Sequence, residues 1–177
     1  TRATELDPDD ADNWRGLGYV YHLGIKDYEK ALNYYEKSLE VDSTNVNSIN
    51  SKALIYVEQK KYDLAIKEYS KGILLKEIDP EGAAYCYRNR AEQYERLREY
   101  DKALADYDSV IVLDPENVNR YNNRAWFYSD IKKDYDLAFI DFTKAIELAP
   151  DGPNNYNARA DFYKDYSKYD LALTDYA

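Results

Sequence analysis

Few residues of this chain could carry out chemistry, and they are not grouped as an active site requires. His22 is the only histidine and Cys86 the only cysteine, and no histidine lies near Cys86 in the sequence. We expect His22 to be exposed on a helix face and the Cys86 thiol to be inert. The carboxylates are expected on solvated helix faces and in first turns of helices, and neither a glycine-rich phosphate loop nor metal-ligand spacing occurs. The sequence therefore predicts no enzyme, no metal site and no cofactor.

The composition excludes several classes of partner. The formal net charge is −10, whereas nucleic acids and anionic membranes need a basic face, so neither is expected as a partner. No apolar run approaches the ~18 residues of a membrane span. The single cysteine excludes an internal disulfide framework, is compatible with a reducing compartment and favours the cytoplasm. The chain has 21 tyrosines but only 6 glycines and 5 prolines, and so few turn residues argue against a many-stranded β fold.

A short pattern, Tyr-x-x-Ala, recurs five times along the chain. Successive alanines are 34, 38, 35 and 34 residues apart. Each copy is preceded by a small residue with a tyrosine three positions after it, and an aromatic residue follows each alanine after four positions. The alanines are Ala31, Ala65, Ala103, Ala138 and Ala172. Self-similarity at such a period indicates a repeat architecture.

The first copy identifies the kind of repeat. Residues 14–21 read Trp-Arg-Gly-Leu-Gly-Tyr-Val-Tyr, which matches the pattern W-x-x-L-G-x-x-Y of tetratricopeptide repeats, and Ala31 and Tyr35 continue it. Nearly the whole chain resembles this family. The resemblance implies an all-α fold, a right-handed superhelical solenoid of antiparallel helix pairs. The chain should then act as a scaffold or adaptor that binds a protein or peptide.

We number each repeat so that Trp14 occupies repeat position 4. The predicted segments are 1–10, the tail of a preceding repeat, then repeats 11–45, 46–83, 84–117, 118–152 and 153–177, the last incomplete, all in one solenoid domain. Leu74–Glu81 is expected to lengthen the second helix or the following loop of its repeat. The first and fourth repeats gain one residue in the turn between their helices, near Ile25–Asp27 and Lys132–Asp134. We expect the chain to be an excerpt, or the ordered part, of a longer array.

Position 7 departs from the family pattern. It is Leu17 in the first repeat but a cation in the others, and position 23 changes with it from Tyr34 to an acid. The cation–acid pairs are Lys52–Glu68, Arg90–Asp106, Arg124–Asp141 and Arg159–Asp175. Because a buried charge needs a partner, we predict a partly buried ion pair within each of these repeats. An apolar Leu17–Tyr34 contact should replace it in the first.

In this family the first helix of each repeat lines the concave face, which predicts a peptide-binding groove. Asparagines are concentrated there although asparagine is a mediocre helix former, and their amides could bind the backbone of an extended peptide. The predicted groove residues are Arg15, Tyr19, Asn47, Asn50, Tyr85, Arg88, Asn89, Asn119, Asn122, Asn123, Trp126, Asn154 and Asn157. The alternative is that asparagine is a soluble filler in a chain of biased composition, and Asn119 and Asn154 could serve as helix caps.

A subclass of the family grips chaperone C-terminal carboxylates with Lys, Asn and Arg at fixed groove positions. The matching positions here hold other residues, such as Tyr19, Ser51, Glu92 and Ala158, so this clamp is not expected. Two other functions stay open. The chain could be a self-assembly module that forms a homo-oligomer through exposed solenoid ends, or the targeting segment of a larger enzyme.

Overall fold

The computed structural model describes residues 2–177, and Thr1, part of the predicted 1–10 tail, lies outside them. The described residues form helices and turns without a strand, which confirms the predicted all-α fold of helix pairs. The chain divides into two compact units, one that ends at Glu99 and one that comprises Tyr100–Ala177. The grouping of all repeats into one solenoid domain stays a prediction.

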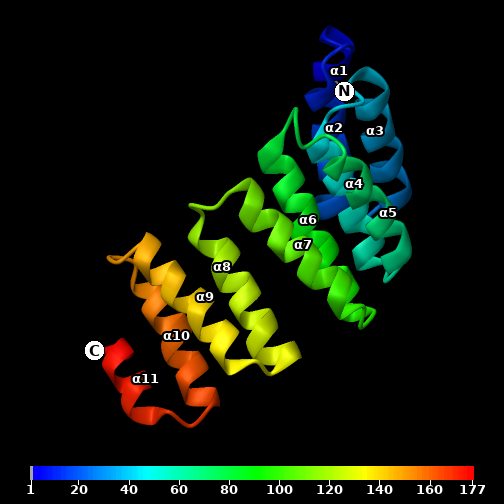
Figure 1. The fold of residues 1–177 in the computed structure, drawn as a ribbon. Helices are drawn as coiled ribbons and strands as arrows, with labels where there is room; N and C mark the ends of the chain where they lie inside the picture. The colour runs from blue at the N-terminus through cyan, green and yellow to red at the C-terminus, as the bar shows by residue number, and fades with distance from the viewer. Residues whose placement is uncertain (1) are drawn as a thin grey trace. The chain divides into compact units, whose positions relative to one another are not determined.

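In the first unit, consecutive helices pack side by side (Figure 1). Its elements are α1 (Arg2–Leu6), α2 (Ala11–Tyr19), η1 (Val20–Ile25), α3 (Tyr28–Val41), α4 (Val46–Glu58), α5 (Tyr62–Ile73) and α6 (Pro80–Arg96). α2 pairs with α3 and α4 with α5, while α6 lies along α5 and also touches α4. The small residues at position 8 and the alanines at position 20 are buried where the helices of a pair meet, because small side chains permit close approach.

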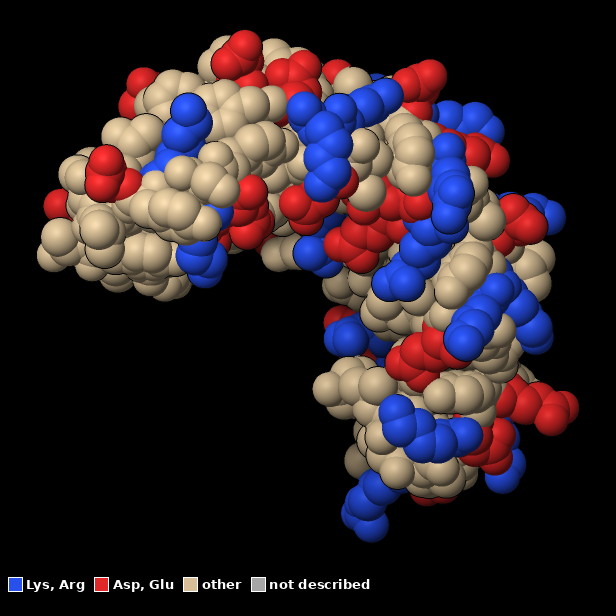
Figure 2. All heavy atoms as spheres, turned by 90° about the horizontal axis from the view of Figure 1, so that it is seen from below, with Lys and Arg blue, Asp and Glu red and all other residues tan. Residues whose placement is uncertain are grey.

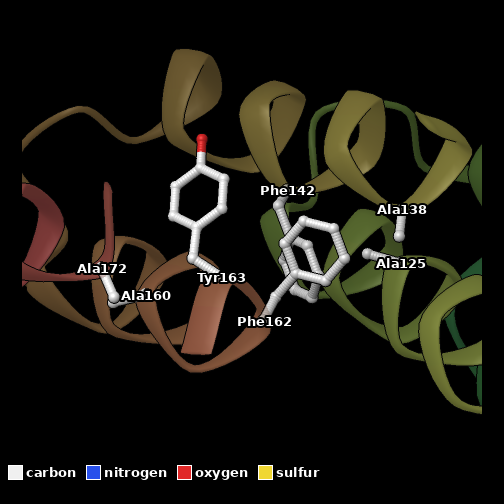
Figure 3. Close-up of a cluster of buried hydrophobic side chains, with 7 residues drawn as sticks. All are labelled: Ala125, Ala138, Phe142, Ala160, Phe162, Tyr163 and Ala172. Carbon is white, nitrogen blue, oxygen red and sulfur yellow. The ribbon is translucent and has the colours of Figure 1, made fainter. Parts of the chain in front are cut away.

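The second unit repeats this arrangement. Its elements are α7 (Tyr100–Leu113), α8 (Val118–Trp126), η2 (Phe127–Lys132), α9 (Tyr135–Leu148), α10 (Pro153–Asp165) and α11 (Tyr169–Tyr176). In its core, the rings of Phe142 and Phe162 pack with their centroids 5.1 Å apart (Figure 3). Ala125 and Ala138 come from facing helices beside these rings, so the alanines set the helix spacing and the aromatic rings fill the remaining space.

The extra residue of the first and fourth repeats is absorbed at the end of the first helix. η1 and η2 are π-helical turns that continue α2 and α8. In a repeat without the extra residue, the bond that closes the turn runs from Lys61 N to Tyr56 O, while at η1 it runs one residue further, from Asp27 N to Tyr21 O. The framework tyrosine carbonyl is the acceptor in both cases. The wider turn therefore accommodates an insertion while the second helix keeps its start.

The residues 74–79 form turns between α5 and α6, and α6 begins early, with Pro80 at its first turn. α5 and α6 approach closely at Gly72, where a Cβ would lie 2.5 Å from Sγ of Cys86. A glycine is needed here because any side chain would push the two helices apart.

Each turn between the helices of a repeat contains one left-handed residue, always two positions before the anchor tyrosine. These residues are Lys26, Lys60, Arg98, Lys133 and Ser167, with φ between 55° and 64°. This conformation closes helix C-termini, but it favours glycine because a Cβ is crowded there. The chain therefore carries a small conformational cost at every repeat.

Replacing Lys60 by glycine should raise the free energy of unfolding by roughly 0.5–1 kcal/mol, since the left-handed strain is removed. The matched control is Lys67→Gly, an exposed position inside α5, which should lower it by about 1 kcal/mol. Urea denaturation followed by circular dichroism measures both. Equal destabilisation by the two variants would contradict a strained turn.

Candidate functional site

The predicted groove residues lie on the first helices of the repeats, and in the first unit several of them bind one another. Asn89 Nδ2 donates to Asn50 Oδ1 at 2.9 Å, which joins α4 to α6. Arg88 Nη2 donates to Asn89 Oδ1 at 2.8 Å. Asn89 is buried. These amides therefore form hydrogen bonds inside the protein, between neighbouring repeats, which leaves fewer of their donors and acceptors for a ligand.

A similar bridge occurs in the second unit. Asn122 Nδ2 donates to Asn155 Oδ1 at 3.1 Å, and Asn155 Nδ2 donates to the carbonyl of Ala149 at 3.3 Å. Asn155 is buried at position 3 and was missed among the groove asparagines, because position 3 is not one of the positions that point into the predicted groove. Asn122 Oδ1 is buried without a hydrogen-bond partner in the described chain, a condition that buried amides rarely tolerate.

Five predicted asparagines keep their amides available. Their side chains make no hydrogen bond within the described chain, and all of them are at least partly exposed. They are Asn47 in the first unit and Asn119, Asn123, Asn154 and Asn157 in the second. Asn119 and Asn123 lie on α8, which ends at Trp126, and Asn154 and Asn157 lie on α10.

The three predicted aromatic anchors differ in exposure. Tyr19 and Tyr85 are 55% and 43% exposed, so both rings present surface to solvent. Trp126 is half-buried, with its ring edge-on to Phe142 at 5.0 Å. Part of Trp126 therefore belongs to the core of the second unit, and only the rest can contact a ligand.

The charged groove residues already have carboxylate neighbours. Arg15 Nε lies 2.8 Å from Asp12 Oδ1, and this contact, although opposed by slight burial, lowers the pKa of Asp12. Arg88 Nη1 lies 3.7 Å from Glu92 Oε1. On the surface seen in Figure 2, basic and acidic side chains are interspersed. Neither arginine therefore offers an uncompensated positive charge to a ligand.

His22 is not on an exposed face, so that prediction was wrong. It is only 3% exposed, with Nε2 3.1 Å from Oε1 of Glu58 and its ring edge-on to Tyr28 and Tyr35. Glu58 also accepts a 2.7 Å bond from Tyr28. The π turn η1 changes the angular register of the helix, so that position 12 turns inward against the next repeat. Partial burial opposes ionisation of Glu58, but its bonds from Tyr28 and His22 prevail and lower its pKa.

The predicted ion pairs between positions 7 and 23 are confirmed where both partners lie in one unit. Their shortest distances are 3.9 Å for Lys52–Glu68, 2.8 Å for Arg124–Asp141 and 2.7 Å for Arg159–Asp175. Both arginines bind their aspartate through Nε and Nη2 together. Such two-bond pairing is what arginine, unlike lysine, provides.

Each position-7 cation also has a second partner, which the sequence reasoning missed. It reaches back to position 25 of the preceding repeat. The contacts are Lys52–Glu36 at 3.3 Å, Arg90–Ser70 at 2.7 Å, Arg124–Asp108 at 2.6 Å and Arg159–Thr143 at 3.3 Å. We call this contact the inter-repeat staple. The sequence signal for this contact is a fixed spacing between the cation at position 7 and a side chain with an oxygen acceptor at position 25 of the preceding repeat.

The first repeat replaces this arrangement with stacked rings. Tyr34 lies between Tyr21 and Trp14, with centroid distances of 5.3 and 6.2 Å. In the third, fourth and fifth repeats the position-7 guanidinium lies over the ring at position 11, as Arg124 does over Tyr128. Tyr34 thus packs on the position-11 ring, as an arginine does in the last three repeats, while the Leu17–Tyr34 contact stays a prediction.

The remaining candidates for chemistry are confined to the protein interior. Cys86 is buried, and burial raises the pKa of its thiol to about 12, so the reactive thiolate is scarce at neutral pH. Within residues 2–177, no group of histidine, cysteine and acidic side chains is arranged to hold a metal ion. In the same part of the chain, no helix combines the length and the apolar character that crossing a bilayer requires.

Comparison with known proteins finds relatives that match this chain over part of their own length. The chain is 31% identical over 97 residues to the STIP1 homolog of Dictyostelium discoideum, which covers 50% of this chain and 16% of that protein. It is 28% identical over 96 residues to human serine/threonine-protein phosphatase 5, covering 54% of this chain and 18% of the phosphatase. The chain thus spans less than a fifth of either relative.

Solved structures show the same fold. The structure of PilF from Pseudomonas aeruginosa superposes with a TM-score of 0.75 over 98% of this chain and 76% of that chain, at 18% identity. Sequence profiles described as tetratricopeptide repeat match residues 11–45, 46–79, 84–117 and 118–151, which together make up most of the sequence. With its helix pairs and framework positions as described, the chain belongs to the tetratricopeptide repeat family.

Proposed function

We propose that this chain is a non-catalytic scaffold that binds a peptide or protein segment on the face formed by the first helices of its repeats. Related proteins point in this direction. One relative, from Triticum aestivum, is named Hsp70-Hsp90 organizing protein and is 27% identical over 122 residues. Its name describes a protein that brings other proteins together, which agrees with an adaptor role for a chain of this family.

The observation that carries the proposal is the set of available amides on α8 and α10. The side chains of Asn119, Asn123, Asn154 and Asn157 make no hydrogen bond within the described chain, and all four are at least partly exposed. An amide offers two donors and an acceptor, which matches the alternating groups of an extended peptide backbone. Four such groups on two first helices, α8 and α10, suit a ligand held mainly through its main chain. A mere compositional filler would not require this placement.

The charged residues of this face disfavour one class of partner, a C-terminal carboxylate. The clamp that grips C-terminal carboxylates needs uncompensated cations, whereas Arg15 and Arg88 already face Asp12 and Glu92. A carboxylate ligand would have to compete with these neighbours. We therefore propose an extended segment of low or mixed charge. The net charge of −10 also disfavours nucleic acid and anionic membranes.

The experiment is a peptide-display selection with the purified chain, followed by calorimetric titration of the best binder. Asn123→Ala combined with Asn157→Ala should weaken binding about tenfold, because each lost hydrogen bond is worth roughly 0.5–1.5 kcal/mol. The control is Asn33→Ala, an exposed asparagine on a second helix, α3. Unchanged affinity in the double variant would remove the proposed face. Asn50, Asn89 and Asn122 are poor test positions because they join neighbouring repeats.

A second candidate function follows from the phosphatase relative. Human serine/threonine-protein phosphatase 5 matches this chain over 18% of its own length, so repeats of this kind occur within a protein named as an enzyme. On this proposal the chain positions a catalytic segment of the same polypeptide rather than an independent partner. Identifying the sequence that flanks this chain in its gene tests it, and flanking segments without any catalytic domain would contradict it.

A further inference from the structure

Three carboxylates on the first helices of the first unit differ in the charges around them. Asp12 lies 2.8 Å from Arg15, measured between oxygen and nitrogen. Glu92 lies 3.7 Å from Arg88. Glu58, the last residue of α4, forms no ion pair with an arginine or lysine within the described part of the chain. Of the three, Glu58 is therefore the carboxylate whose negative charge neither arginine nor lysine compensates.

Glu58 is held in place by two hydrogen-bond donors without being covered by them. The hydroxyl of Tyr28 donates to Oε2 at 2.7 Å, and Nε2 of His22 lies 3.1 Å from Oε1. Since an ionised carboxylate only accepts hydrogen bonds, this nitrogen of His22 carries a proton. The side chain of Glu58 nevertheless remains 37% exposed. The carboxylate is thus fixed on one side and open to solvent on the other.

The two donors also keep Glu58 ionised. Partial burial opposes ionisation, but the bonds from Tyr28 and His22 prevail and lower the pKa of Glu58. The bond to Glu58 raises the pKa of the Tyr28 hydroxyl, so this hydroxyl keeps its proton and remains a donor. Glu58 therefore presents a permanent negative charge at a fixed position.

The support behind Glu58 is rigid. His22 is 3% exposed, and its ring lies edge-on to Tyr28 and Tyr35 with centroid distances of 5.9 and 6.3 Å. The imidazole cannot turn away without disturbing this packing. It lies in η1 of the first repeat, whereas Glu58 belongs to the second. A charged group supported in this way is pre-organised for binding, since little of its freedom remains to be lost.

The fourth repeat has the same inserted residue but lacks this arrangement. η2 has Ser129 where η1 has His22, each as the third residue of the turn. Asp165 of the fifth repeat matches the held carboxylate in repeat position. The ring of Tyr166 there lies 5.2 Å from Tyr135, and its hydroxyl donates to the carbonyl of Ser129 at 3.2 Å. A held carboxylate is therefore a feature of the His22 turn and not of every insertion.

The acceptors that remain on Glu58 suit a cationic side chain. An ionised carboxylate can accept about four hydrogen bonds, and each oxygen of Glu58 accepts one from the side chains of Tyr28 and His22. A guanidinium presents two parallel N–H groups that match the two oxygens of a carboxylate. An ammonium supplies the same charge without this geometry. The site therefore suits arginine best and lysine next.

We infer that Glu58, positioned by His22 and Tyr28, binds a basic side chain of a segment held on the first helices of the first unit. This inference rests on the proposed function, because it names the charge of a residue in the ligand. Glu58 is on this view the residue that determines specificity, and His22 and Tyr28 are positioning residues. The net charge of −10 favours the approach of a basic segment.

The first test is a peptide-display selection run in parallel on the unaltered chain and on Glu58→Gln. The unaltered chain should enrich peptides that carry arginine or lysine at one fixed position, and Glu58→Gln should lose this enrichment. The matched control is Glu40→Gln, which removes an equal charge from an exposed position on a second helix, α3, and should keep it. Circular dichroism shows whether each variant is folded.

A double-mutant cycle then identifies the contact. The fixed basic residue of the best binder is replaced by glutamine, and affinities are measured by calorimetric titration. Glu58→Gln or the change in the peptide should each weaken binding about tenfold, and the two together should weaken it no further than one alone. Tyr28→Phe should weaken binding of the original peptide about threefold but not that of the glutamine peptide, a difference that a general loss of stability does not produce.

The possible outcomes distinguish this inference from the proposed function. Binders without a basic residue at a fixed position, or losses that multiply independently in the cycle, would overturn the role of Glu58 while peptide binding stands. A selection that yields no binder at all would overturn peptide binding, and the role of Glu58 with it.

Discussion

Replacing Arg124 by methionine should destabilise the chain by about 3–5 kcal/mol, because it leaves a buried carboxylate without its cation. Asp141 is 2% exposed and receives two 2.8 Å bonds from Arg124. The same guanidinium binds Asp108 at 2.6 Å in the preceding repeat, and these contacts raise the pKa of Arg124, so it stays charged. Urea denaturation followed by far-ultraviolet circular dichroism measures the change.

Two controls separate this buried pair from an ordinary surface pair. Arg15→Met breaks the exposed Arg15–Asp12 contact and should cost less than about 1 kcal/mol. The double variant Arg124→Met with Asp141→Leu should recover much of the lost stability, since an apolar pair of similar volume can replace a buried ion pair. Losses that simply add in the double variant would show that the two side chains are not coupled.

Replacing Gly18 by alanine should also destabilise the chain, although alanine is the better helix former. A Cβ at Gly18 would lie 2.6 Å from two ring carbons of Tyr35, which is completely buried and cannot move aside. Overpacking of this kind costs roughly 1–3 kcal/mol, which outweighs the ~1 kcal/mol that helix propensity contributes. Thermal and urea denaturation measure the net loss.

Gly16→Ala provides the matched control in the same helix. No atom lies within 4 Å of a Cβ placed there, so only helix propensity changes and stability should rise by up to about 1 kcal/mol. Opposite signs at Gly16 and Gly18 would confirm that the buried ring of Tyr35 determines the effect. A gain at both positions would contradict the close approach of α2 and α3.

Spacing alone was sufficient for the repeats and for their ion pairs. Tyr-x-x-Ala recurs at the period of a helical repeat. Positions 7 and 23 vary together, since they hold Leu17 and Tyr34 in the first repeat but Arg124 and Asp141 in the fourth. Both patterns reflect contacts within one helix pair, where separation along the chain determines the geometry. The acceptors at position 25, such as Asp108, went unrecognised because the contact crosses a repeat boundary and involves acids, serine and threonine alike.

The asparagines illustrate the limit of a positional rule. Sequence placed Asn50, Asn89, Asn122 and Asn123 on one face, but only packing decides which amides meet a neighbouring helix. Asn89 and Asn122 bind across repeat boundaries, whereas Asn123 does not. The groove stays a proposal for the amides that remain available.

The sequence by itself determined the all-α repeat fold, the family and the intra-repeat ion pairs, because these depend on local periodicity. Only the tertiary structure decided the surroundings of His22. One inserted residue in the first repeat converts the end of its first helix into a π turn, and the wider turn swings position 12 from solvent into the contact with Glu58. Whether an insertion forms a loop or a π turn depends on the packing of the next repeat. The spacing of residues within one repeat carries no information about that packing.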